Sequence, residues 1–238
     1  MKNFELKSFP SDGELARAAA KDWLALLRQS SAAHLVAVSG GRIAKTFFCA
    51  VTELAATSRT LLGNVDFFWA DERCVPPDHP DSNYLLAKEN LFDGLSIAPD
   101  KIHRLKGELP PAEAVAEANA AIQRIAPKNS AGVPVLDLVF LGLGEDGHVA
   151  SLMPNAPAAA ANSPASYLRV ENSPKPPPNR ISLSYTAIAA AKNVWVLAAG
   201  AGKEEALRQS LRPGATTPLG RVLQSRAQTV IYSDIAVE

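Results

Sequence analysis

Short apolar runs alternate along the chain with segments in which apolar residues recur every three or four positions. The short runs predict buried strands at residues 34–39, 65–70, 135–143, 193–200 and 227–234. The helical spacing predicts helices at residues 12–29, from the Gly40-Gly41 turn to about 54, and at 82–92, 110–126 and 203–211. Shorter strands are expected at 102–105, 167–170 and 181–185. This alternation is typical of an α/β fold, with a mostly parallel sheet covered by helices on both faces.

Length and composition favour one domain. The 238 residues suit one large α/β domain better than two small ones, and 47% of them are apolar, enough for a sizeable core. The stretch 154–166 is rich in Pro, Ala and Ser. It is expected to be an exposed, mobile loop rather than a linker, because the pattern on both sides is the same. A single domain over 1–238 is therefore expected.

Charge and cysteine content restrict the partners and the compartment. Lys plus Arg and Asp plus Glu each number 24, a neutral balance that argues against nucleic acid or an anionic membrane as the main partner. A small anionic substrate needs only a few local cations. The two cysteines show no paired spacing, and neither the N-terminal MKNFELKSFP nor any later run predicts a signal peptide or a membrane span. A cytosolic protein is expected, with Cys49 in the core and Cys74 a buried structural thiol rather than an activated one.

Unusual polar residues follow four of the predicted strands. The four segments are Ser39-Gly40-Gly41-Arg42, Asp71-Glu72-Arg73, Gly144-Glu145-Asp146-Gly147-His148 and Gly200-Ala201-Gly202-Lys203. Ligands of open α/β sheets bind just beyond the carboxyl ends of the strands. The four segments are therefore expected to converge on one pocket.

Two of these segments predict an anion site. Glycines after a strand let the backbone approach a ligand closely, and the N–H groups at the start of the next helix favour phosphate. The alternative for Ser39–Arg42 is an ordinary strand-to-helix turn. Lys203 stands at a helix start, where a cation opposes the helix dipole unless an anion lies nearby. Taken alone, Lys203 would more often be a solvated surface lysine.

The other two segments carry candidate chemistry. A histidine in a Gly-flanked turn, such as His148, can serve as a general base at neutral pH, and Asp146 can fix its tautomer. The alternative is a turn histidine whose ring is satisfied by the backbone. The group Asp71-Glu72-Arg73 indicates recognition of hydroxyls and a carboxylate, whereas its alternative is a weak surface ion pair.

A metal or nucleotide cofactor is not expected. Asp71, Glu72, Asp146 and His148 form a conceivable mixed ligand set, but the other histidines lack ligand spacing and no HExxH or paired-Cys motif is present. The GLGEDG segment has the wrong spacing for a dinucleotide fingerprint.

Several motifs together resemble the 6-phosphogluconolactonase family. They are SGG after the first strand, FFWADERCVPPDHPDSNY, DLVFLGLGEDGHVASLMPN, KPPPNRISLSY and GAGKEEAL, in the family's order from about Val36 to Asp234. The resemblance implies a Rossmann-like three-layer sandwich without a dinucleotide. It also implies hydrolysis of 6-phospho-D-glucono-1,5-lactone in the oxidative pentose phosphate pathway, without a metal, a nucleotide or a covalent intermediate. The larger group includes glucosamine-6-phosphate deaminase and ribose-5-phosphate isomerase.

The resemblance also implies roles for individual residues. His148 takes the place of the base that activates water, Asp71 and Arg73 face the substrate, and Lys203 binds phosphate. Substrate contacts are further expected from Ser39, Gly40, Gly41, Arg42, Asn83, Gly144 and Arg180. Candidate donors to the oxyanion are the backbone N–H groups of the Gly144–His148 turn, Arg73 and Arg180.

One departure from the family pattern concerns the first loop. The family usually has Ser-Thr-Pro after SGG, but this chain has Arg42-Ile43-Ala44. The hydroxyl donors to phosphate are therefore missing. Arg42 either replaces them with a charge-assisted contact or points away.

Two rival functions are weighed. A deaminase or isomerase of the same group typically carries an acidic residue soon after the DGH turn, but here no carboxylate occurs before Glu171. A non-enzymatic sugar-phosphate sensor would usually carry an attached DNA-binding or partner domain, and the chain has no spare length for one.

Overall fold

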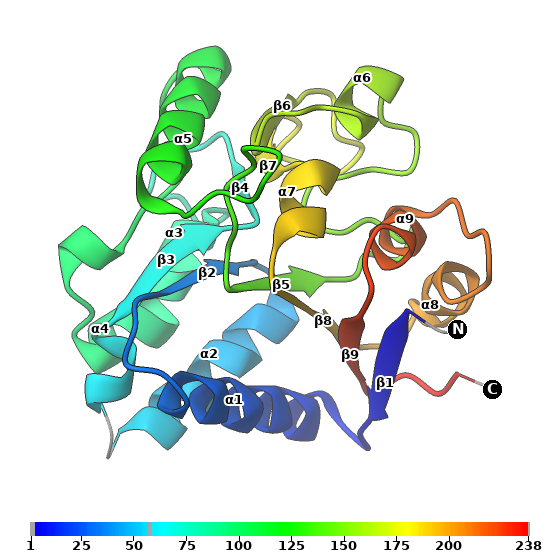
Figure 1. The fold of residues 1–238 in the computed structure, drawn as a ribbon. Helices are drawn as coiled ribbons and strands as arrows, with labels where there is room; N and C mark the ends of the chain where they lie inside the picture. The colour runs from blue at the N-terminus through cyan, green and yellow to red at the C-terminus, as the bar shows by residue number, and fades with distance from the viewer. Residues whose placement is uncertain (1–2, 57–58, 238) are drawn as a thin grey trace.

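A six-stranded parallel sheet forms the centre of the molecule (Figure 1). The computed structural model describes residues 3–56 and 59–237. Its strand order is β1-β9-β8-β5-β2-β3, and every neighbouring pair is parallel. The strands are β1 (Phe4–Ser8), β2 (His34–Val38), β3 (Val65–Trp69), β5 (Leu138–Gly142), β8 (Asn193–Ala198) and β9 (Thr229–Ser233). The predicted parallel sheet is confirmed, and β8, β5, β2 and β3 are consecutive in it.

Two long helices cover one face of this sheet (Figure 1). Helix α1 (Asp12–Arg28) packs against α2 (Arg42–Ala55), and the two reach β9 and β8. The Ser11 hydroxyl caps α1 by accepting a hydrogen bond from the Glu14 N–H at 3.3 Å. The Trp23 ring lies edge-on to Phe140 of β5, with centroids 5.5 Å apart. The apolar face of the helix predicted at residues 12–29 therefore packs against the sheet.

The opposite face carries a second, smaller sheet as well as helices. Its antiparallel order is β4-β7-β6, with β4 Asp71–Arg73, β7 Arg180–Leu183 and β6 Tyr167–Val170. Helix α5 (Pro111–Ile125) packs on β6 and β7. The shorter helices α7 (Tyr185–Ala190), α8 (Glu204–Ser210) and α9 (Pro218–Gln224) complete this side. The three-layer α/β arrangement is confirmed, with an antiparallel sheet added to one outer layer.

The segment between β4 and α5 differs from the prediction in detail. The helix expected at 82–92 begins as α3 (Asn83–Ala87), passes through a π-helical turn at Lys88–Phe92 and ends as α4 (Asp93–Leu95). Two short 3₁₀ turns lie at Arg59–Leu62 and Pro99–Lys101. The strand expected at 102–105 does not form, because only Ile102 bridges to β3, at Phe67.

Four elements were missed or misread from the sequence. The edge strand β1, the helices α7 and α9, and the strand β4 were not expected. Each is short, and β4 is polar, so none has a clear apolar period. The loop 154–166 is only half exposed, and it contains the short helix α6 (Ala158–Ala161).

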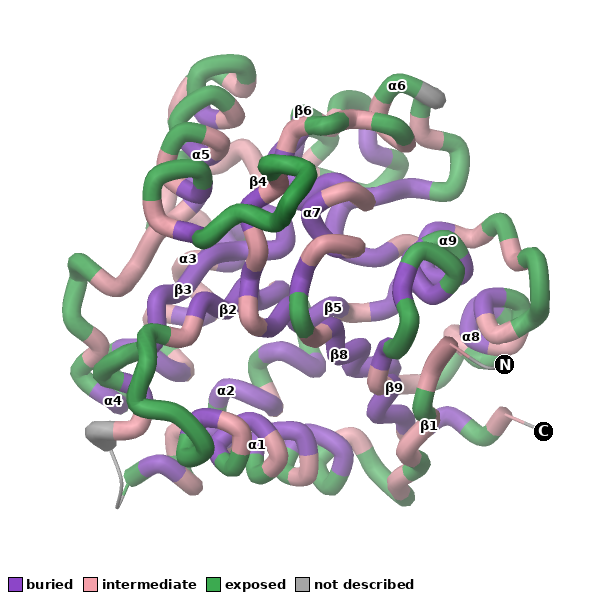
Figure 2. The backbone as a smooth tube through the Cα atoms, viewed as in Figure 1, coloured by how far each residue is buried: buried purple, intermediate pink, exposed green. Residues whose placement is uncertain are grey.

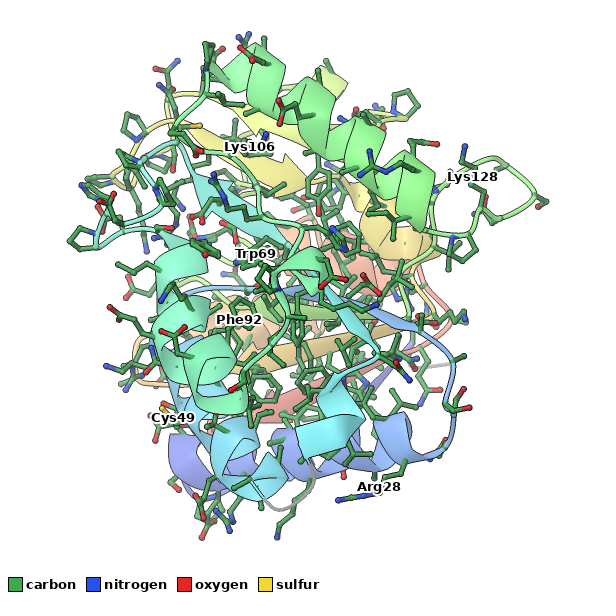
Figure 3. The ribbon with its side chains drawn as sticks, turned by 90° about the vertical axis from the view of Figure 1, so that its left-hand side faces the viewer. Arg28, Cys49, Trp69, Phe92, Lys106 and Lys128 are labelled. Atoms are coloured by element: carbon green, nitrogen blue, oxygen red, sulfur yellow. The ribbon has the colours of Figure 1, made fainter. Side chains whose placement is uncertain are left out.

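Burial is concentrated where the sheet meets its two covering layers (Figure 2). All five residues of β3 are buried, and Trp69 lies edge-on to Phe92, with centroids 5.9 Å apart (Figure 3). Cys49 is exposed, so its prediction as a core residue is wrong. It lies on the outer side of α2, beside Asn90. Within the described parts of the chain, no helix is long and apolar enough to cross a lipid bilayer.

Candidate active site

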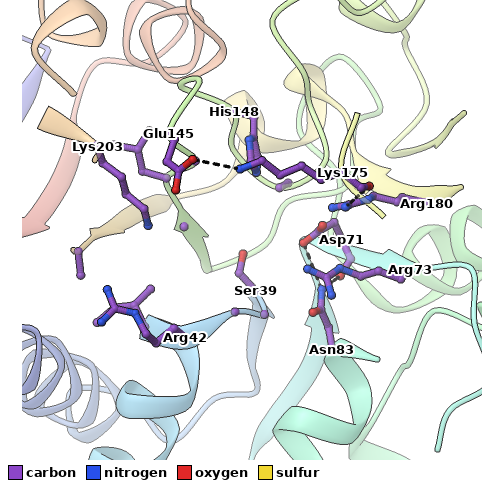
Figure 4. A pocket seen from close by; sticks show the side chains of 18 of the residues that line it. Ser39, Arg42, Asp71, Arg73, Asn83, Glu145, His148, Lys175, Arg180 and Lys203 are labelled. Atoms are coloured by element: carbon purple, nitrogen blue, oxygen red, sulfur yellow. Dashed lines mark hydrogen bonds and ion pairs between the residues drawn. The ribbon is translucent and has the colours of Figure 1, made fainter. Parts of the chain in front are cut away.

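A pocket of about 340 Å³ opens at the carboxyl edge of the parallel sheet (Figure 4). The residues after β2, β3, β5 and β8 all contribute to it, so the predicted convergence of four strand ends is confirmed. Eleven of the twelve predicted site residues line it: Ser39, Gly40, Gly41, Arg42, Asp71, Arg73, Asn83, Gly144, His148, Arg180 and Lys203. Asp146 lies behind His148 instead.

The N-terminus of α2 forms one end of this pocket. Its N-cap Gly41 has φ +90°, a conformation that favours glycine, and no side chain caps the free N–H groups. A Cβ atom on Gly40 would overlap the side chain of Asn83. The two glycines therefore let a strand, a helix start and Asn83 meet in one place, with uncapped N–H groups at the pocket wall.

Two cations stand at the same end. Arg42 lines the pocket, and its guanidinium lies beside Gly200, where an added Cβ would collide with it. Its ion pair with Asp12 is 3.4 Å long, and the Arg42 side chain remains 68% exposed. Lys203 is the N-cap residue of α8. Burial, Arg42 and Lys175 lower the pKa of Lys203, and the opposing charges of Glu145 and Asp234 only partly offset them.

The Ser39 hydroxyl is not free to donate to a ligand. Ser39 Oγ donates to the carbonyl of Phe140 at 2.9 Å and so ties β2 to β5. The predicted substrate contact from Ser39 is therefore not available from its hydroxyl hydrogen, because that hydrogen is already committed. The Asn83 amide is also engaged, since Nδ2 donates to the Asp71 carbonyl at 2.8 Å.

Asp71 is buried and fixed from two sides. Its Oδ2 accepts a hydrogen bond from the buried Ser151 hydroxyl at 2.6 Å, and its Oδ1 lies 3.4 Å from Asn83 Nδ2. The alternative interpretation of this segment, a surface ion pair, is thus excluded for this carboxylate. Ser151 was not predicted, because its only sequence signal is its place after the DGHVA segment.

Glu72 clamps the segment that carries Asp71 and Arg73 onto the start of α3. Its carboxylate accepts hydrogen bonds from the N–H groups of Arg73, Asn83 and Tyr84, each at 2.8 Å, and from the Ser82 hydroxyl at 3.1 Å. Burial nevertheless raises the pKa of Glu72 to about 7. Glu72 therefore holds the pocket wall together without lining it.

We expect Glu72→Gln to lower the free energy of unfolding by about 1–3 kcal/mol, because the amide NH₂ group would face the two donors that one carboxylate oxygen now accepts. Denaturant unfolding at pH 8 measures the change, with the exposed Glu89→Gln as a matched control. Equal stabilities of the two variants would show that the four hydrogen bonds contribute little.

The His148 ring is oriented by Asp146. The Asp146 Oδ1 atom lies 2.5 Å from His148 Nδ1 and also accepts the His148 N–H at 3.2 Å. Burial opposes ionisation of Asp146, but the hydrogen bond and charge of His148 outweigh it and lower the pKa of Asp146. The carboxylate assigns the proton to Nδ1 and leaves Nε2 as the acceptor.

Three backbone donors of the turn that carries His148 are used within the turn. Gly144 N–H donates to the His148 carbonyl, Gly147 N–H donates to the Gly144 carbonyl, and His148 N–H donates to Asp146. These three N–H groups are therefore committed to the tight turn. Of the five predicted oxyanion donors in this turn, the N–H groups of Glu145 and Asp146 remain.

The two arginines predicted to line the pocket, Arg73 and Arg180, also donate hydrogen bonds within the protein. Arg73 Nη1 donates to the Asp81 carbonyl at 2.8 Å. Arg180 Nε donates to the Pro177 carbonyl, and Arg180 Nη2 donates to the carbonyls of Lys175 and Pro176. Arg180 lines the pocket, yet its main hydrogen bonds hold the Pro-rich turn.

Two charged residues of the pocket were not predicted. Lys175 enters from the Pro-rich turn, and Glu145 enters from the turn after β5. Their side chains meet at 3.8 Å (Figure 4). The two positions are thirty apart in sequence and lie in irregular segments, so no periodic pattern could have paired them.

Other chemistries find little support among the described side chains. In residues 3–56 and 59–237, no three His, Cys, Asp or Glu residues are grouped as a metal site would require. Burial, together with Glu72, raises the pKa of Cys74, which opposes formation of a thiolate. Cys74 is only partly buried, so its prediction as a buried thiol is wrong, but its raised pKa fits a structural rather than an activated thiol.

The fold is that of an α/β protein. Its pocket, at the carboxyl edge of the parallel sheet, holds a group of cations suited to bind an anion and a histidine that is oriented by an aspartate. A family model described as glucosamine-6-phosphate isomerases/6-phosphogluconolactonase matches residues 10–231. The chain belongs to this family.

Individual relatives agree with that assignment. The chain is 37% identical to 6-phosphogluconolactonase of Streptomyces coelicolor over 182 residues, 74% of this chain and 69% of that protein. It is 35% identical to probable 6-phosphogluconolactonase 3, chloroplastic, of Oryza sativa over 185 residues, 75% of this chain but only 56% of that longer protein. The solved structure of 6-phosphogluconolactonase from Trypanosoma brucei has a TM-score of 0.87 at 27% identity, covering 98% of this chain and 97% of that one.

Proposed function

We propose that this protein hydrolyses 6-phospho-D-glucono-1,5-lactone to 6-phosphogluconate in the cytosol, as a step of the oxidative pentose phosphate pathway. The observation that carries the proposal is the opening of the His148–Asp146 pair into a pocket whose far end holds Arg42 and Lys203. The end with Arg42 and Lys203 is suited to bind the phosphate of a sugar phosphate. The end with His148 is suited to catalyse the attack of water on an ester. The relatives named 6-phosphogluconolactonase support the same substrate.

The phosphate is bound at the helix end of the pocket. The uncapped N–H groups of α2 and the charges of Arg42 and Lys203 favour a dianion there. Arg42 supplies charge at the position where the family pattern has hydroxyl residues. The lactone ring then extends toward His148 and Asp71.

Water is activated by His148 in the reaction that follows. Nε2 takes a proton from water as the water oxygen bonds to the lactone carbonyl carbon, while Asp146 stabilises the protonated ring. The bond from this carbon to the ring oxygen then breaks, and the proton on Nε2 passes to that oxygen. The products are a free hydroxyl and a carboxylic acid that loses its proton to solvent to become a carboxylate, with no metal, nucleotide or covalent enzyme intermediate.

The direct test is hydrolysis of the freshly prepared lactone with spontaneous hydrolysis subtracted and EDTA present. We expect enzyme-dependent hydrolysis that EDTA leaves unchanged. Loss of activity on chelation, restored by zinc or magnesium, would contradict the metal-free mechanism. Deamination of glucosamine 6-phosphate without lactone hydrolysis would instead favour the rival activity in the family, and sugar-phosphate binding without turnover would favour a sensor.

Lys203→Met should separate phosphate binding from chemistry. We expect binding of 6-phosphogluconate to weaken by about 10- to 100-fold, the usual range for a charged hydrogen bond, with kcat within a few-fold of wild type. Calorimetric titration and steady-state kinetics measure the two effects, with the exposed Lys21→Met as control. An unchanged affinity for 6-phosphogluconate would contradict the assignment of Lys203 to phosphate binding.

The affinity for product should also depend on pH. The pKa of Lys203 is lowered, so its ammonium is lost at a lower pH than that of an ordinary lysine. Because only the ammonium attracts phosphate, wild-type affinity should fall as pH rises through this lowered pKa, and the fall should be smaller in Lys203→Met.

A further inference from the structure

The reaction needs a positive donor near His148. The oxygen of the attacked carbonyl becomes negatively charged, and stabilising this charge is a large part of catalysis in acyl transfer. Three of the turn N–H groups are engaged inside the turn, and Arg73 Nη1, Arg180 Nε and Arg180 Nη2 donate to backbone carbonyls. A cation whose charged group is less committed is therefore a stronger candidate for this role.

Lys175 has a fixed backbone and an uncommitted ammonium. The buried Arg180 holds the Lys175 carbonyl at 2.9 Å and the Pro176 carbonyl at 3.2 Å, which anchors the turn. The ammonium itself donates no hydrogen bond to another side chain or carbonyl in the described structure, and its one ion pair is with Glu145. All three N–H donors of Lys175 are thus free for a ligand.

The ion pair between Lys175 and Glu145 is weak enough for a ligand to replace Glu145 as the partner of Lys175. The two charged groups are 3.8 Å apart, and their side chains are 47% and 66% exposed. Ion pairs of this kind contribute little to stability. Figure 4 shows Lys175 extending past His148 toward Glu145, over the space where the substrate would lie.

The charge of Lys175 also acts on Lys203, a second lysine of the pocket. It is among the causes that lower the pKa of Lys203, after burial and Arg42. An ammonium that disturbs Lys203 is close enough to interact with a ligand bound between the two lysines. Glu145 offsets this charge while the pocket is empty.

We propose that Lys175 is a catalytic residue, whose ammonium leaves Glu145 and stabilises the oxyanion that forms when water attacks the lactone carbonyl beside His148. Glu145 is a positioning residue that pairs with Lys175 at the pocket and competes with the substrate for it. Arg180 acts through the turn by fixing the backbone of Lys175. This role rests on the proposed lactonase function.

A double-mutant cycle tests the exchange. Lys175→Met should lower kcat by about 10²-fold, the usual loss for one oxyanion donor, with a smaller change in KM, and Lys175→Arg should recover part of it. Glu145→Gln should tighten binding of 6-phosphogluconate by about three-fold, within the range of an exposed ion pair. In the Lys175→Met background this gain should disappear, because no cation is left to release.

The controls separate this inference from the proposed function. Lys128→Met removes an exposed lysine elsewhere and should change neither quantity. A wild-type protein that fails to hydrolyse the lactone would refute the lactonase proposal itself. An active wild type whose Lys175→Met variant keeps kcat within three-fold, or a Glu145→Gln gain that persists without Lys175, would overturn only the role of Lys175. Thermal unfolding of each variant checks that the fold is retained.

Discussion

His148→Asn is expected to lower kcat for lactone hydrolysis by about 10²- to 10⁴-fold, the usual share of positioned acid–base catalysis. Asparagine is polar and of similar size, and His148 lies in a turn rather than in the packed core. Binding of 6-phosphogluconate, measured by calorimetry, should therefore stay within a few-fold of wild type. This split between turnover and binding distinguishes a base from a residue that only shapes the pocket.

The chain offers a matched control in a second His–Asp pair. His103 Nε2 lies 2.8 Å from Asp66 Oδ1, and its side chain is 17% exposed, against 16% for His148. His103 lines a different cavity, beside α5. His103→Asn should leave kcat within a few-fold. If His148→Asn does the same, the base lies elsewhere, and Asp71 is the next residue to test.

Gly144→Ala should be nearly as damaging without removing any functional group. A Cβ atom at this position would lie 2.1 Å from the His148 ring and 2.8 Å from Asp146 Oδ1, so the ring must move. Displacing a catalytic group by about 1 Å can cost on the order of 10²-fold in rate. We expect kcat to fall by at least about that factor, with thermal stability and product binding affected much less.

Gly13→Ala serves as the control for this substitution. Gly13 is exposed in α1, and a Cβ there would approach only Ser11, at 4.0 Å. Replacing a helical glycine by alanine typically stabilises by about 0.5–1 kcal/mol, so activity should be unchanged. A Gly144→Ala enzyme with wild-type kcat would mean that the position of the His148 ring is not critical.

Much of the site could be predicted because its signals are local. Glycines and charges directly after apolar runs marked Ser39, Asp71, Gly144 and Lys203, and the general rule for parallel sheets placed them together. The adjacency of β8, β5, β2 and β3 then brought the four segments to one pocket. The orientation of His148 by Asp146 also follows from their two-residue spacing in a tight turn.

The parts that could not be predicted depend on tertiary partners. The polar run Asp71–Arg73 becomes a strand only because β7 pairs with it. The sequence also does not reveal which donors are already spent within the protein. The Ser39 hydroxyl and the Gly144 N–H are both suitable for a ligand by type, yet each is bound within the fold. The contact between Lys175 and Glu145 likewise depends on the tertiary structure and could not be predicted from the sequence.

The central claim is that water, activated by His148, attacks the lactone carbonyl directly. A single turnover in H₂¹⁸O, with enzyme in excess over the lactone and product analysed by mass spectrometry, tests it most directly. Direct attack predicts one ¹⁸O atom in the carboxylate of 6-phosphogluconate from the first turnover, formed much faster than in the absence of enzyme. Unlabelled product in that turnover would contradict the account, because it would show that an enzyme carboxylate such as Asp71 attacks first and transfers its own oxygen.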